Sequence, residues 1–232
     1  MEGYSQDTLR FLFENRAMDS RAWFHEHREE YERLVLAPTR ELVTALAPAV
    51  RAIDPELSVE PKVGRCISHI NRDTRFTLNK ELYRDVVWIA FCREKYAGYP
   101  SLYFEFSPRA LRWGCGWHET PKPTVERIRG MALCDSPLWQ SADACLHRAY
   151  GAKLEDARYK RTHFPVETEQ KRAWLDQRTF CVTGESEALE PLFAENLSDW
   201  VGKRLRRIAP VYQLFLQATL SADRENDSEG RN

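Results

Sequence analysis

Two neighbouring segments in the middle of the chain alternate between apolar and other side chains, and this pattern constrains the fold most. One face of residues 102–106 carries only Leu and Phe, and one face of residues 111–118 carries only Leu, Trp and Cys. Successive strand side chains point to opposite faces, so both segments are typical of strands with one face on a core. The turn between them, Ser107-Pro108-Arg109, is too short for the crossover that parallel strands need. The sequence therefore predicts an antiparallel sheet.

The distribution of apolar residues also predicts further strands and flanking helices. A continuous β-prone apolar run at 86–91 predicts a strand covered on both faces. Residues 64–70 and 179–183 also read as strands. Helical periodicity predicts helices on both sides of the sheet, with breaks at the prolines. In order they are 8–15, a helix capped by Asp19 or Ser20, 39–53, 124–132, 136–150, 168–176 and 197–220.

The expected architecture is α+β. An antiparallel sheet, a meander of about four to five strands, packs with N-terminal and C-terminal helices. We expect residues 1–220 to form a single domain, because no linker or repeat divides them. Residues 221–232 are polar and lack apolar periodicity, which predicts a disordered tail.

The composition of the chain argues against several classes of function. The net charge is −1, so no global field attracts nucleic acid, and nucleic acid is not an expected partner. No stretch approaches the ~20 apolar residues that span a bilayer, and the N-terminus does not resemble a secretory signal. The six cysteines contain no Cys-x-x-Cys pair, so we expect buried thiols in the cytoplasm, no metal site and no cofactor. The oligomeric state stays open.

A dense group of charges lies between two predicted strands. It contains Arg72, Asp73, Arg75 and Lys80, followed by Tyr83. Two arginines three residues apart can converge on one anion, because the guanidinium group meets a carboxylate or phosphate as a bidentate fork. Alternatively, Asp73 pairs with an arginine and the charges form a structural network. Both interpretations stay open at this point.

A second candidate feature is the last strand of the meander. Its polar face carries Arg112, Gly114, Gly116 and His118. Glycine inside a strand often marks the close approach of a ligand or of another backbone. The face is therefore the floor of a pocket, or a helix crosses it tightly, or the strand forms a bulge near its end. For acid–base chemistry, if the protein is an enzyme, His118 and Glu105 are the candidates.

These features resemble the domain of unknown function 2461 family. The charged segment Arg72-Asp73-Thr74-Arg75-Phe76, followed by Lys80 and Tyr83, is similar to that family's Arg-Asp-x-Arg-Phe signature. The glycine strand at 114–117 and the opening helices around 9–38 fit its usual order. The chain departs from the signature at Thr77, Asn79, Leu82 and Arg84. The loss of a carboxylate at Asn79 argues against a role that needs that group.

The resemblance implies an α+β domain and a cytosolic protein, and it implies no reaction. It suggests that the charged loop and the glycine strand belong to one site. We expect this site to bind a small phosphate or carboxylate through Arg72, Asp73, Arg75, Lys80, Tyr83, Arg112, Gly114 and Gly116. The alternative is a non-catalytic interaction domain in which the loop is a salt-bridge network and the helix at 203–207 faces a partner.

Overall fold

The computed structural model describes residues 3–75, 78, 80–93, 98–148, 151–165 and 167–229, with only the backbone described for 223–229. The chain forms two compact units. The first contains Met1–Phe91, Tyr103–Trp113 and Glu185–Lys203. The second contains Cys92–Leu102, Gly114–Gly184 and Arg204–Asn232. That residues 1–220 act as a single domain stays a prediction.

Within the described residues, the strands form one five-stranded antiparallel sheet. They are β1 (Val87–Phe91), β2 (Ser101–Phe106), β3 (Leu111–Gly116), β4 (Ala152–Leu154) and β5 (Cys181–Ser186). Their order is β1-β2-β3-β5-β4, so the first three form the predicted meander and β5 lies between β3 and the short β4. The predicted α+β class with an antiparallel sheet is confirmed.

The apolar faces of β2 and β3 lie in the core, as their alternation predicts. Leu102, Phe104 and Phe106 are fully buried. The expectation that β1 is covered on both faces is wrong, because its burial alternates. Val87, Ile89 and Phe91 are buried, whereas Trp88 is only half-buried. The apolar run therefore includes one partly exposed face, which carries Trp88.

The predicted strand at 64–70 is also wrong. Gly64 has φ +81°, a left-handed conformation that ends an extended segment in a turn. Only isolated bridges form here, such as Ile67 with Ile89. Backbone hydrogen bonds from Ser68 N to Trp88 O and from Ala90 N to Cys66 O still hold the segment beside β1.

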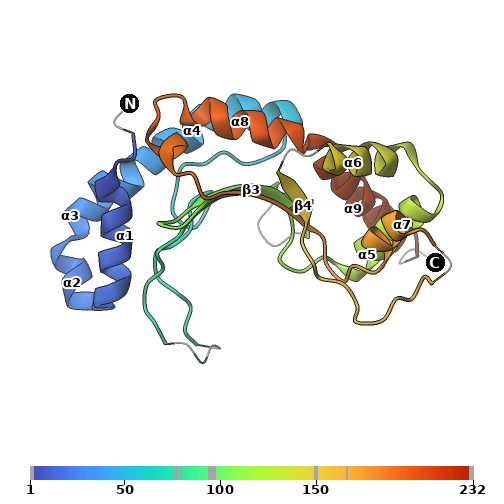
Figure 1. Cartoon of the computed structure of the whole chain (residues 1–232), viewed down its shortest axis with the longest axis horizontal. Coiled ribbons are helices and arrows are strands. Elements are labelled where there is room, and N and C mark those ends of the chain that lie inside the picture. Colours follow the sequence, from blue (N-terminus) through green and yellow to red (C-terminus); the bar gives the residue numbers. More distant parts are fainter. Residues whose placement is uncertain are drawn as a thin grey trace. The chain divides into compact units, whose positions relative to one another are not determined.

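The helices of the first unit begin at the N-terminus. They are α1 (Gln6–Met18), α2 (Arg21–Glu26), α3 (Arg28–Tyr31), the π-helical segment η1 (Glu32–Leu36) and α4 (Ala37–Ile53). The short 3₁₀ helix η2 (Glu190–Phe193) and most of α8 (Leu197–Arg207) also belong to this unit. The Ser20 hydroxyl accepts a hydrogen bond from Trp23 N, which confirms it as the α2 cap. Figure 1 shows α1 alongside α2 and α3.

The second unit holds the remaining helices. They are α5 (Lys122–Leu133), α6 (Pro137–His147), α7 (Glu169–Leu175) and α9 (Ala209–Glu229), and α5 and α6 both pack against α9. The α6 and α7 helices are capped by the hydroxyls of Ser136 and Thr168. The backbone of α9 continues to Glu229, into the segment for which the sequence predicted disorder. No helix in the described part of the chain is long and apolar enough to cross a membrane.

Pro38 does not interrupt the helical run but changes its hydrogen bonding. Proline has no N–H to donate to the carbonyl four residues earlier, which is that of Leu34. The Thr8 hydroxyl of α1 donates to this carbonyl at 2.9 Å, and the Thr39 hydroxyl donates to Val35 O. Both threonines are buried. Side chains therefore add hydrogen bonds to two carbonyls at the point where Pro38 donates none.

This arrangement predicts the effect of replacing Thr8. The Thr8→Val variant keeps the shape but removes the donor to Leu34 O and the acceptor for Ser5 N. The change takes one hydrogen bond from the part-buried Leu34 carbonyl and one from Ser5 N, so we expect a loss of about 1–3 kcal/mol in unfolding free energy. Urea denaturation measures it. Thr8→Ser retains the hydroxyl and is the control; equal stability of both variants would contradict the account.

Candidate functional site

The charged loop, which runs from Arg72 to Arg84, lies in the excursion between α4 and β1. The two arms at the base of this loop pair with each other. Asn71 and Tyr83 form an antiparallel bridge. It is flanked by hydrogen bonds from Arg72 N to Leu82 O (2.8 Å) and from Arg84 N to Ile70 O (3.0 Å). In this register Arg72 and Arg84 lie diagonally on one face of the pair, and Asn71 and Tyr83 lie on the other. Figure 1 shows the excursion leaving the sheet and returning to it.

The face that carries Asn71 and Tyr83 anchors the loop to the core. Tyr83 is 4% exposed and its ring centroid lies 5.0 Å from that of Phe24. On the returning arm, Leu82 N donates to the carboxylate of Asp19 at 2.7 Å. Asp19 ends α1 in a left-handed conformation. Tyr83, which the sequence placed among ligand-binding residues, thus lies where it supports the loop.

The outer part of the loop is held by its own charges. Arg75 pairs with Asp73 through two hydrogen bonds of 3.0 and 2.8 Å, and Lys80 Nζ donates to Thr74 O at 2.8 Å. The hydrogen bonds from the Arg75 side chain and backbone lower the pKa of Asp73 to about 2. Both partners are exposed, so solvent screens the pair and it adds little stability. The motif residues Phe76, Thr77 and Asn79 lie outside the described residues.

A chain of ion pairs connects the base of the loop to other elements. Arg72 contacts Glu81 at 3.2 Å, and Arg16 of α1 contacts both Glu81 (3.2 Å) and Asp85 (2.9 Å). Arg109, in the turn between β2 and β3, contacts Asp85 through two hydrogen-bonding nitrogens at 2.8 and 3.1 Å. No sequence pattern marks Arg16, Asp85 and Arg109 as a group, because they converge only in the folded chain.

Asp85 is the buried centre of this chain of ion pairs, with 5% of the residue exposed. Burial alone would raise the pKa of its carboxyl group. The hydrogen bonds and charges of Arg109 and Arg16 outweigh that effect and lower the pKa. Asp85 is therefore ionised at neutral pH, and two guanidinium groups contact both of its oxygens.

Arg84 is in a different situation. Its guanidinium carbon lies 4.6 Å from the ring centroid of Trp88, a cation–π contact. Within the described part of the chain, Arg84 has no carboxylate in ion-pair contact. Burial lowers its pKa, the positive charge of Arg72 lowers it further, and the charge of Asp73 offsets only part of this decrease. Two guanidinium groups on one face of the loop therefore repel each other.

These residues line a pocket of about 370 Å³. Its described lining is Arg16, Arg72, Asp73, Arg84, Asp85, Val86 and Trp88, all in the first unit. The indole N–H of Trp88 donates to Glu105, and Arg112 contacts both Glu105 (3.1 Å) and Glu185 (3.0 Å). Glu105 and Arg112 therefore form a layer behind Trp88 that fixes its ring. Glu105 already accepts two hydrogen bonds here, which fits a positioning role better than proton transfer.

The predicted residues His118, Gly114 and Gly116 belong to the second unit. His118 is exposed, and its backbone carbonyl accepts a 3.5 Å hydrogen bond from Thr179. Gly116 has φ +132°, and a Cβ added there would lie 2.3 Å from Phe180 O. The close approach of another backbone thus explains why Gly116 must be glycine. That the loop and this strand form one site stays a prediction.

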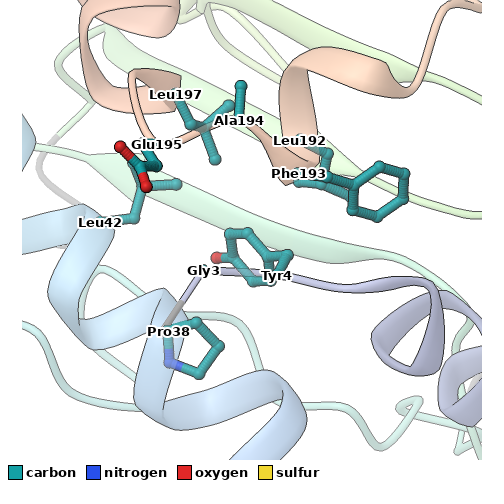
Figure 2. A pocket seen from close by; sticks show the side chains of 9 residues that line it. All are labelled: Gly3, Tyr4, Pro38, Leu42, Leu192, Phe193, Ala194, Glu195 and Leu197. Carbon is teal, nitrogen blue, oxygen red and sulfur yellow. The ribbon is translucent and has the colours of Figure 1, made fainter. Parts of the chain in front are cut away.

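Described residues of the first unit also line two further pockets. A groove of about 670 Å³ runs along α2, α3 and the 63–71 segment, and its lining includes His25, His69 and Asn71. A small cavity of about 100 Å³ lies between the N-terminal segment, α4 and η2 (Figure 2). It is apolar apart from Tyr4 and Glu195, and the Tyr4 hydroxyl already donates to Thr39. No group of three metal-ligating side chains comes together among the described residues.

Comparison with known proteins identifies a family. A family model described as "Conserved hypothetical protein (DUF2461)" covers residues 7–214. No curated protein and no solved structure matches the chain. The matched region contains the whole charged loop and every residue of the ion-pair chain.

The role of Asp85 can be tested by replacing it with asparagine. Asp85→Asn leaves Arg16 and Arg109 without their shared charge, so we expect a loss of about 1–3 kcal/mol at neutral pH. The pKa of Asp85 is lower in the folded chain than its unfolded value of about 3.9. Its stabilisation is thus complete above that value and lost as pH falls through the folded pKa.

The measurement is denaturant unfolding of wild type and Asp85→Asn from pH 7 downwards. The gap between the two should be largest at pH 7 and close below about pH 4. Asp73→Asn, in the exposed pair, is the control and should leave the neutral-pH midpoint unchanged. A gap that persists unchanged into acid would show that charge at Asp85 is not the cause.

Proposed function

Because the chain belongs to the DUF2461 family of conserved hypothetical proteins, whose description names no reaction, we propose its function from geometry: the pocket at the base of the charged loop binds an anion. The ligand is a phosphate or a carboxylate. Arg72 and Arg84 contact it, and Trp88 forms the wall of the site. Arg75 and Lys80, which the sequence suggested as ligands, hold the loop in shape instead.

The observation that carries the proposal is the pair of arginines on one face of the loop. Arg84 has no ion-pair partner among the described residues, and the charge of Arg72 disfavours its protonated form. An anion between the two would accept hydrogen bonds from both guanidinium groups and remove their repulsion. Charge-assisted hydrogen bonds of this kind are roughly twice as strong as neutral ones.

The surroundings support rigid recognition. Arg72 is fixed by Glu81, and Arg84 is fixed by its contact with Trp88. Trp88 is in turn held by its hydrogen bond to Glu105. Binding therefore requires little ordering of side chains, which lowers the entropic cost of association.

The alternative is a structural salt-bridge network without a ligand. Asp85 favours it for one part of the cluster, because Arg16 and Arg109 occupy both of its oxygens. We assign that part to stability and the Arg72–Arg84 face to binding. We also propose a cytoplasmic location, because the cysteines show no paired spacing and the cytoplasm keeps thiols reduced.

A thermal-shift experiment with inorganic phosphate, phosphate monoesters and small dicarboxylates tests the proposal. At a hundred times its Kd, a ligand adds about 2.7 kcal/mol of stability, or about 5–10 °C in Tm for a chain of this size. Arg84→Gln should abolish this increase and change the ligand-free Tm little, because it removes a charge without an ion-pair partner.

Arg75→Gln is the matched control, since it removes an arginine of the same loop whose charge is already paired with Asp73. It should retain the ligand-induced increase. The binding proposal is wrong if no anion raises the Tm of the wild type and Arg84→Gln lowers the ligand-free Tm as strongly as Asp85→Asn does.

A further inference from the structure

The segment Arg158–Phe164 of the second unit combines basic and aromatic side chains on the surface. Its sequence is Arg-Tyr-Lys-Arg-Thr-His-Phe. Every residue from Arg158 to His163 is exposed, and Phe164 is half-buried. Exposed cations alternating with rings are typical of surfaces that bind nucleic acid, where rings stack on bases and cations contact phosphates.

The segment is held in place at two points by one buried residue. Asp176, which is 6% exposed, accepts a hydrogen bond from Tyr159 N through its backbone carbonyl at 2.9 Å. Its carboxylate accepts a second one from His163 N at 3.0 Å. Both ends of the turn are thus fixed, and Lys160 and Arg161 lie at its tip.

The rings form a preformed stack. Tyr159 and His163 are parallel within 13°, with centroids 4.5 Å apart. Arg129 lies 5.6 Å from the Tyr159 ring and 6.0 Å from the Phe164 ring. It is buried and fixed by hydrogen bonds to the carbonyls of Leu175 (2.8 Å) and Gln177 (2.9 Å). A buried, fixed cation therefore supports an exposed pair of rings.

The charges at the tip are available for a partner. Arg158 pairs with Asp156 at 2.8 Å, but Lys160 and Arg161 have no ion pair or hydrogen bond within the described part of the chain. The second unit holds 18 Lys and Arg against 14 Asp and Glu, although the whole chain has a net charge of −1. The second unit, which contains this surface, is therefore basic although the chain as a whole is nearly neutral.

We propose that this surface binds single-stranded nucleic acid, with a base continuing the Tyr159–His163 stack and Lys160 and Arg161 contacting the adjacent phosphates. A duplex keeps its bases stacked on each other and offers no free ring face, so it does not fit. An acidic peptide would use the cations but has no use for the parallel rings. The proposal is independent of the anion site in the first unit.

Fluorescence anisotropy with a labelled oligouridylate and oligothymidylate of about ten nucleotides tests the proposal on the full chain, over about 50–200 mM salt. We expect His163→Ala to weaken binding about five- to hundred-fold, the range seen for one stacked base. His163→Phe keeps a ring and should retain affinity. The double variant Lys160→Ala/Arg161→Ala should reduce the salt slope by about 0.7 for each phosphate that it no longer neutralises.

The matched control is Lys122→Ala/Arg148→Ala, which removes the same charge from exposed positions elsewhere in the second unit. It should leave affinity and salt slope close to those of the wild type. Binding of either oligonucleotide with this pattern supports the proposal. It is overturned if neither binds, if an RNA duplex binds equally well, or if His163→Ala binds like the wild type.

Discussion

The antiparallel pairing of Asn71 with Tyr83 is the constraint on which the candidate site depends. Its register places Arg72 and Arg84 on one face and Tyr83 on the other. The buried Tyr83 ring fixes the second face against Phe24. Two like charges are therefore held near each other by hydrophobic packing on the opposite side, at an electrostatic cost that an anion would remove.

Asp85, at the base of the same loop, connects the loop to the rest of the first unit. It forms ion pairs with Arg16 of α1 and with Arg109 in the turn after β2, and so joins the base of the loop to two other elements. Arg72 shares the carboxylate of Glu81 with Arg16. Arg84 is in ion-pair contact with neither Glu81 nor Asp85. The distribution of ion pairs, rather than the number of arginines, separates the structural part of the cluster from the part we propose to bind a ligand.

The sequence predicted what local patterns determine. Alternation located β2 and β3, and the hydroxyls of Ser20 and Ser136 were recognisable caps. The charged loop was recognisable as an unusual cluster. Local patterns could not show that Arg16 and Arg109 converge on Asp85, because these ion pairs join residues distant in the chain. Likewise, the glycine pattern of β3 could not distinguish a pocket floor from the backbone of Phe180 against Gly116.

The central claim is that Arg72 and Arg84 bind one anion together. Its most direct test is a titration with inorganic phosphate followed by NMR of the arginine Nε–Hε groups. We expect saturable shifts of the Arg72 and Arg84 signals with one shared Kd, and no comparable shift for Arg75. Unchanged Arg72 and Arg84 signals, or equal shifts at all exposed arginines, would contradict the claim.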